Sequence, residues 1–214
     1  MIDGQTALFG FIAHPAKHSR SPRMHNLSFD YWGLNARYLA FDVAPDQLAG
    51  TLAGIRSMGI AGVNLSMPFK QTVVPLLDGL TARAQRIQAV NTIKNEAGKL
   101  IGDSTDGAGV FQDLQHQGMR LTNQHIMVLG AGGAGKAIIA AALDYNVASV
   151  TVFKRHNERY AGVQQWLDQL RTTTTVPLKL CAYEDQQRMQ QIACTSDLII
   201  NATNIGMTTA GTPL

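Results

Sequence analysis

The chain has 214 residues, of which 45% are hydrophobic and 15% are charged, and its formal net charge is +3. This composition can bury a substantial core and excludes intrinsic disorder. Basic residues form no run and do not alternate with aromatic residues, so we expect no nucleic-acid partner. No apolar stretch approaches the length of a membrane span.

Cysteine and histidine spacing gives no signal for a disulfide or a metal. Cys181 and Cys194 form no C-x-x-C pair, which is typical of reduced thiols in a cytoplasmic protein. The histidines lack H-E-x-x-H or comparable spacing, so no metal is predicted. The apolar run over 7–13 is too short for a signal peptide, and no basic segment precedes it. We therefore expect a cytoplasmic protein.

Strands and helices alternate through the first half of the chain. We expect strands over 6–13, 36–43 and 60–66, helices over 21–32, 45–58 and 81–87, a short helix after Pro68, a β-hairpin over 89–102, and a helix over 106–117. Ser21 and Pro22 suit an N-cap followed by proline in the first helical turn. Gly33 and Gly118 are expected to end the helices that precede them.

The pattern restarts after Gly118. Strands are expected over 125–129, 149–153, 177–182 and 196–201, with helices over 134–145, 158–170 and 184–193. Such alternation predicts an α/β protein with mostly parallel sheets covered on both faces. We place one domain at 1–105 and a second at 106–214, with the 106–117 helix as connector. Ligands of these folds bind beyond the carboxyl ends of the strands.

The stretch His125–Gly135, HIMVLGAGGAG, leads from an apolar strand through a glycine turn into a helix. In G-x-G-x-x-G spacing, the first glycine permits a tight turn, the second lets backbone approach a pyrophosphate, and the third lets helix and strand pack closely. The alternative is a plain strand–turn–helix connection, but the flanking strand and helix favour a Rossmann-type dinucleotide-binding domain. The predicted cofactor contacts here are Gly130, Ala131, Gly132, Gly133, Ala134 and Gly135.

The next strand, Ser149–Phe153, ends about 20 residues beyond the first glycine, where such domains bind the cofactor's ribose. An NAD site would place Asp or Glu there, whereas this chain has Lys154, Arg155 and, one helical turn later, Arg159. Because cations suit a 2′-phosphate, these residues favour NADP. The alternative is a solvated basic loop, whose charge Glu158 reduces.

Polar clusters stand where strands of the first half end, over 19–21, 64–70, 91–92 and 103–106. Because strand ends converge, these clusters could line one pocket for a small polyhydroxylated acid. A lysine and a carboxylate in one pocket also form a credible proton-transfer pair. Each residue has a plain structural explanation as well: Ser21 and Asp106 as helix caps, Asn91 as a partner of the hairpin backbone, and Lys70 as a solvated side chain.

Six motifs follow one another along essentially the whole chain. They are Ser19-Arg-Ser-Pro-Arg-Met-His25, Asn64-Leu-Ser-Met-Pro-Phe-Lys70, Ala89-Val-Asn-Thr92, Gly102-Asp-Ser-Thr-Asp-Gly107, the Gly130–Gly135 turn and Asn201-Ala-Thr203. In order and spacing they resemble the motifs of shikimate dehydrogenases. The resemblance implies an NADP-dependent oxidoreductase that interconverts 3-dehydroshikimate and shikimate, a step toward aromatic amino acids.

The resemblance also implies roles for individual residues. Lys70 would be the catalytic acid and base, paired with Asp106. The substrate would be bound through its carboxylate or its ring hydroxyls by Ser19, Ser21, Ser66, Asn91 and Asp106. The nicotinamide would lie near Asn201, Ala202, Thr203 and Met207. His25 is interpreted as a packing residue rather than a catalyst.

The chain departs from the family pattern in three places. Ser104 stands where the family commonly has asparagine, and Lys154–Asn157 replaces the Asn-Arg-Thr of NADP-specific members. Asn64–Pro68 is closer to the quinate/shikimate branch, whose members accept quinate and NAD. A quinate/shikimate dehydrogenase using NAD or NADP is therefore one alternative. A non-catalytic module that binds shikimate or a dinucleotide is another, and the pair of Lys70 and Asp106 argues against it.

The family continues beyond the position of Leu214 with further strands and helices, including a glutamine that touches substrate. We therefore expect the second domain to be incomplete in this sequence, so that the chain as given could be inactive. Its expected partners are small molecules (shikimate, 3-dehydroshikimate and, for the quinate/shikimate alternative, quinate), and a homodimer is compatible with the sequence.

Overall fold

The computed structural model describes residues 2–206 and 211. The chain forms two compact units, Met1–Thr105 and Asp106–Leu214, which we call the first and the second unit. Among the described residues, no helix is long and apolar enough to cross a membrane.

The first unit is built on a six-stranded sheet with the order β2-β1-β3-β5-β6-β4. Its strands are β1 (Ala7–Ala13), β2 (Ala36–Asp42), β3 (Gly62–Leu65), β4 (Gly79–Leu80), β5 (Thr92–Glu96) and β6 (Lys99–Asp103). β1 runs parallel to β2 and β3, whereas β5 runs antiparallel to β3 and β6. The sheet is mixed because the expected hairpin, β5 and β6, adds to it directly.

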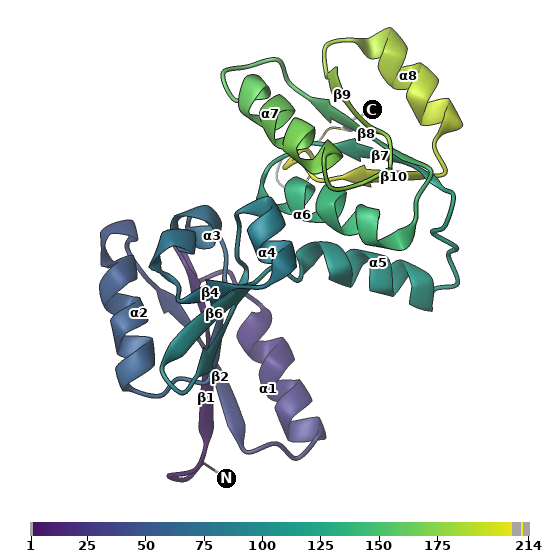
Figure 1. Ribbon diagram of the computed structural model, residues 1–214. Coiled ribbons are helices and arrows are strands. Elements are labelled where there is room, and N and C mark those ends of the chain that lie inside the picture. The colour runs from purple at the N-terminus through teal and green to yellow at the C-terminus, as the bar shows by residue number, and fades with distance from the viewer. Residues whose placement is uncertain (1, 207–210, 212–214) are drawn as a thin grey trace. The chain divides into compact units, whose positions relative to one another are not determined.

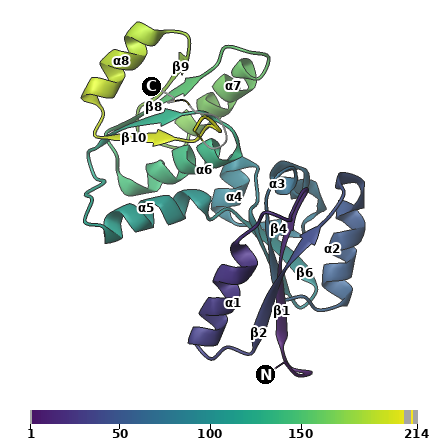
Figure 2. The same cartoon turned by 180° about the vertical axis from the view of Figure 1, so that it is seen from behind.

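Helices cover this sheet on both faces. They are α1 (Ser21–Tyr31), α2 (Leu48–Ser57), α3 (Phe69–Thr72) and α4 (Ala82–Ile87), with short 3-10 turns at Pro45–Gln47 and Val74–Leu76. α1 and α2 lie on opposite faces (Figures 1 and 2), because the chain crosses from β1 to β2 in one direction and from β2 to β3 in the other. α2 buries Leu48, Leu52 and Ile55, at helical spacing, against Ile12 and Val63.

α1 begins at Ser21, as the sequence predicts, but its N-cap residue differs from the prediction. Arg20, with φ −92° and ψ −5°, is the N-cap residue, and no side chain caps the helix. Ser21 is the first helical residue, and its N–H donates to Ser19 Oγ at 3.2 Å. The expected N-cap role of Ser21 is therefore wrong, because Arg20 has already taken up helical dihedral angles.

The second unit contains a parallel sheet with the order β10-β7-β8-β9. Its strands are β7 (His125–Leu129), β8 (Ser149–Lys154), β9 (Leu178–Ala182) and β10 (Leu198–Asn201). Its helices are α5 (Asp106–His116), α6 (Gly133–Ala142), α7 (Tyr160–Arg171) and α8 (Gln186–Thr195), with a 3-10 turn at Leu143–Tyr145. Gly118, with φ +87°, follows α5, where the sequence predicts the helix to end.

In the second unit, the strand order changes direction beside the carboxyl end of β7. The chain steps from β7 through β8 to β9 on one side of β7 and returns to place β10 on the other side. α6 and α7 consequently lie on one face and α8 on the other (Figure 1). The strand order therefore reverses beside β7, and open α/β sheets bind ligands beyond the carboxyl end of the strands at such a point. That end is the glycine turn.

Candidate functional site

The carboxyl ends of β1 and β3 lie side by side in the first unit. Ile12 pairs in register with Leu65. Beyond the strands, Ser66 N donates to Ile12 O at 3.0 Å, and His14 N donates to Met67 O at 3.1 Å. The loop after β1, which carries Ser19, thus begins beside the segment that carries Ser66.

Backbone hydrogen bonds bring two more of the predicted site residues to the same edge of the sheet. Leu65 N donates to Asn91 O at 2.8 Å, and Val90 N donates to Lys70 O at 2.7 Å. Asn91 N in turn donates to Asp103 O at 3.0 Å. Segments that are far apart in the sequence therefore hold Lys70 and Asn91 near each other through their main chains.

The carboxamide of Asn91 forms hydrogen bonds with Thr92 and Thr105. This side chain is only 8% exposed. Its Oδ1 accepts from Thr105 N at 2.9 Å and from Thr92 Oγ1 at 3.0 Å, and its Nδ2 donates to Thr105 Oγ1 at 3.1 Å. Asn91 thereby fixes Thr105, and the chain continues from there to Asp106, the first residue of α5. We call Ser66, Lys70, Asn91 and Thr105 the polar cluster.

Further hydrogen bonds, which begin at Tyr38, support this cluster, and no sequence pattern predicts the role of Tyr38. Tyr38 Oη donates to Asn64 Oδ1 at 2.7 Å, and Asn64 Nδ2 donates to Thr92 Oγ1 at 3.0 Å. Burial raises the pKa of Tyr38 to about 12, so its hydroxyl stays protonated and remains a donor at neutral pH. Tyr38 stands in an ordinary strand pattern, and only the fold brings it to Asn64.

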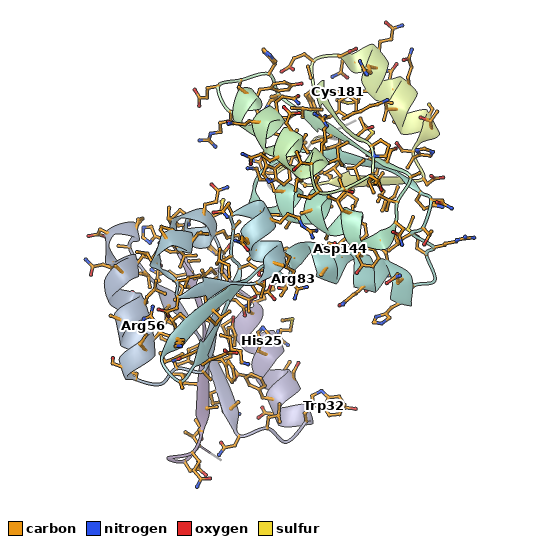
Figure 3. All side chains as sticks on the ribbon, viewed as in Figure 1. His25, Trp32, Arg56, Arg83, Asp144 and Cys181 are labelled. Atoms are coloured by element: carbon orange, nitrogen blue, oxygen red, sulfur yellow. The ribbon has the colours of Figure 1, made fainter. Side chains whose placement is uncertain are left out.

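His25, on α1 (Figure 3), has the packing role that the sequence suggested. Its ring stacks on Tyr38 with centroids 4.3 Å apart. Burial lowers the pKa of His25 and so favours the neutral ring. Among the described residues, no group of three or more His, Cys, Asp or Glu side chains could hold a metal ion.

In the second unit, the three motif glycines differ in what constrains them. Gly130 has φ +97°, a conformation that residues with a Cβ rarely adopt, and its N–H donates to Phe153 O at 2.8 Å. A Cβ at Gly135 would lie 2.3 Å from Gly130 O, so only glycine permits this close packing of helix against turn. Gly132 is exposed, and a Cβ there would meet no atom within 4 Å. Nothing inside the fold requires glycine at Gly132, which leaves room for a ligand as the explanation.

The segment after β10 lies against the glycine turn. Ala202 N donates to Leu129 O at 2.8 Å, and a Cβ at Gly130 would lie 2.9 Å from Thr203 Cγ2. Asn201 Oδ1 accepts from Thr203 N at 3.0 Å and from Thr203 Oγ1 at 2.7 Å. Asn201, Ala202 and Thr203 therefore form an ordered turn beside Gly130, whereas Met207, predicted to contact the cofactor, lies outside the described residues.

The residues predicted to bind the 2′-phosphate lie in the segment 154–159, which we call the cation loop. Lys154 Nζ donates to Asn157 Oδ1 at 2.9 Å, and the same oxygen accepts from Arg159 N at 3.1 Å. Burial lowers the pKa of Lys154, and the nearby charges of Arg155 and Arg159 lower it further. Arg155 and Arg159 are close enough to Lys154 to repel its charge, so an anion at this loop would be stabilised.

Comparison with known proteins agrees with this arrangement. A family model described as the shikimate dehydrogenase substrate binding domain matches residues 11–93. A shikimate dehydrogenase (NADP(+)) of Latilactobacillus sakei is 48% identical over 215 aligned positions, which cover 100% of this chain and 74% of that protein. The chain belongs to the shikimate dehydrogenase family.

Solved structures of family members share the fold. The shikimate 5-dehydrogenase of Listeria monocytogenes, in complex with shikimate and NAD, superposes with a TM-score of 0.92 at 36% identity, over 97% of this chain and 72% of that one. The enzyme of Thermus thermophilus, in complex with NADP(H) and shikimate, has a TM-score of 0.78 at 32% identity, over 94% and 69%. The chain therefore spans about three quarters of the length of its relatives.

Proposed function

We propose that the chain supplies the substrate site and the dinucleotide site of an NADP-dependent shikimate dehydrogenase, which interconverts 3-dehydroshikimate and shikimate in aromatic amino acid biosynthesis. The observation that carries the proposal is the polar cluster. Lys70 and Asn91 are held together by the main chain, and Thr105 connects them to the start of α5. Close relatives over the whole chain carry this activity in their names.

The proposed substrate contacts follow from the chemistry of the ligand. Hydroxyl groups donate readily to a carboxylate, so Ser19, Ser21 and Ser66 bind the acid group of shikimate. Carboxamide and carboxylate groups form hydrogen bonds with ring hydroxyls, which is the role of Asn91 and Asp106. The buried network behind Asn91 leaves its side chain little freedom, so it is already oriented before substrate arrives.

Proton transfer is the proposed role of Lys70. Its ammonium donates a proton to the substrate oxygen when the ketone is reduced and takes the proton back when the alcohol is oxidised. Asp106 orients the ammonium and stabilises its charge. The main-chain bond from Val90 N to Lys70 O fixes the base of the lysine side chain at the edge of the sheet.

The second unit fits NADP as the cofactor, which supplies and accepts the hydride when bound. The open space at Gly132 lets the backbone approach a pyrophosphate, and the N-terminus of α6 favours its negative charge. Lys154, Arg155 and Arg159 suit the 2′-phosphate. NAD in the Listeria complex supports NAD as a second candidate.

The proposed setting is the cytoplasm, in keeping with the free thiols of Cys181 and Cys194. The proposed ligands are small molecules and not nucleic acids. Light scattering measures whether the chain forms a homodimer. Quinate is a second candidate substrate because the sequence of Asn64–Pro68 is closer to that of the quinate/shikimate branch.

The test is an absorbance assay of NAD(P)H at about 340 nm with shikimate or quinate and NADP or NAD, in all four combinations. We expect the fastest turnover with shikimate and NADP. Lys70→Ala should lower kcat by about 10²- to 10⁴-fold while shikimate binding, measured by calorimetry, changes little. Faster turnover with quinate and NAD would favour the other branch of the family. Shikimate binding without turnover, both by this chain and by a chain of the full length of its relatives, would favour a binding module.

A further inference from the structure

The cation loop has an acidic neighbour, Glu184, that comes from a later part of the chain. β8 and β9 run parallel, with Lys154 in register with Ala182, and Tyr183 N continues the ladder by donating to Lys154 O at 2.9 Å. The chain then turns toward α8, and this turn carries Glu184. The ladder therefore brings a carboxylate from the end of β9 to a loop that follows β8.

The carboxylate of Glu184 holds the loop through its main chain. His156 N lies 3.2 Å from Glu184 Oε1 and 3.1 Å from Glu184 Oε2, so both oxygens share this donor. Inside the loop, Asn157 N donates to Arg155 O at 3.0 Å. Glu184 thus fixes the peptide that directly follows Arg155, one of the predicted 2′-phosphate residues.

The same carboxylate also acts on the loop through its charge. The negative charge of Glu184 acts to raise the pKa of Lys154, which opposes the lowering by the charges of Arg155 and Arg159. A carboxylate close to Lys154 and bound to the cation loop lowers the positive potential that a 2′-phosphate would experience there. In an NAD site an acidic residue at the end of β8 would instead accept from the 2′-hydroxyl. Here the acidic residue comes from the next strand and is bound to a backbone amide.

We propose that Glu184 is a positioning residue that sets the preference between a 2′-phosphate and a 2′-hydroxyl: it orders the cation loop through His156 N–H, and its charge limits the affinity for the phosphate. This inference rests on the proposed dinucleotide site of the second unit. It assigns cofactor preference to a residue outside the glycine turn and outside the loop that carries the cations.

The test compares two nucleotides that differ only at the 2′ position, adenosine 2′,5′-bisphosphate and 5′-AMP, by titration calorimetry at low ionic strength. Glu184→Gln removes the charge and keeps one acceptor for His156 N–H. It should tighten binding of the bisphosphate by about three- to fivefold and leave 5′-AMP within about twofold. Glu184→Ala removes the acceptor as well, so its affinity for the bisphosphate should increase less than that of Glu184→Gln. Added salt should reduce the gain, because it screens the charge.

Glu158→Gln is the matched control, because Glu158 and Glu184 are both exposed and carry the same charge, but the carboxylate that accepts from His156 N is that of Glu184. An equal gain in Glu158→Gln and Glu184→Gln would overturn the proposal, as would an unchanged ratio of the two affinities in Glu184→Gln or equal gains in Glu184→Gln and Glu184→Ala. Binding of 5′-AMP by the unchanged protein separates these failures from a failure of the proposed function. If the unchanged protein bound neither nucleotide, both proposals would be wrong.

Discussion

Arg83 and Asp103 form a two-pronged ion pair at the end of β6; Arg83 lies on α4 (Figure 3). Arg83 Nε lies 2.7 Å from Asp103 Oδ1 and Nη2 lies 2.8 Å from Oδ2, while Thr81 Oγ1 donates to Oδ1 at 2.5 Å. Burial raises the pKa of Asp103, but these hydrogen bonds, the one from Ser104 N and the charge of Arg83 outweigh it. The pKa of Asp103 therefore lies below its ordinary value of 3.8.

The sign of this shift predicts how stability depends on pH. Because the pKa is lower in the folded protein, ionised Asp103 stabilises the fold above pH 3.8, and the contribution is lost as the pH falls through the lower folded value. We expect Asp103→Asn to cost about 1 kcal/mol at pH 7, after allowance for solvent screening, or about 4 °C in the unfolding midpoint.

Scanning calorimetry at pH 7 and pH 3 measures this difference. The gap between the unchanged protein and Asp103→Asn should narrow at pH 3, and exposed Asp46→Asn should move the midpoint little at either pH. An equally large gap at pH 3 and pH 7 would contradict the assignment. Nothing in the sequence pairs Arg83 with Asp103, because their contact depends on α4 lying beside the end of β6.

The glycine turn makes a prediction at the level of one element. Gly135→Ala forces a Cβ to within 2.3 Å of Gly130 O, so it should destabilise the second unit by about 1–3 kcal/mol. Gly132→Ala meets open space at φ −76°, so it should leave the unfolding midpoint within about 1 °C. If a pyrophosphate occupies that space, the same methyl group should weaken NADP binding roughly tenfold.

The two alanine variants control for each other, because both add one methyl group to the same turn. Calorimetric melting and NADP titration on each variant separate stability from binding. Unchanged NADP affinity in Gly132→Ala would show that the ligand does not approach the backbone there. An unchanged unfolding midpoint in Gly135→Ala would show that the turn can relax away from α6.

Periodicity and capping residues predicted most elements to within a few residues, including β7, which spans the predicted 125–129. They missed β4, Gly79–Leu80, because two residues are too few to show a period and its pairing with β6 is a tertiary contact. They placed the start of α1 at residue 21, as observed, but named the wrong N-cap residue. Ser21-Pro22 is a good N-cap pair by composition, but the preceding residue already has helical dihedral angles.

At the scale of the whole molecule, the restart of the strand–helix pattern after Gly118 predicts two domains, and the structure divides between Thr105 and Asp106. The site motifs could be found in the sequence because each occupies a few consecutive residues. Tyr38 and Glu184 could not be found in this way. Each acts across a sheet on a motif more than 20 residues away, and no local pattern encodes that contact.

The proposed shikimate contacts over 66–91 and the proposed dinucleotide contacts over 130–159 predict two separate patterns of hydrogen exchange. Shikimate should slow amide exchange over 65–70 and 90–92, where the backbone amides belong to the polar cluster and its supports. Adenosine 2′,5′-bisphosphate should instead slow exchange over 130–136 and at His156, whose amide is held by Glu184. Exchange mass spectrometry with each ligand alone measures both, with 5′-AMP as the control for the 2′-phosphate. Protection of residues 130–136 by shikimate alone, with no change over 65–70, would contradict the placement of the substrate site in the first unit.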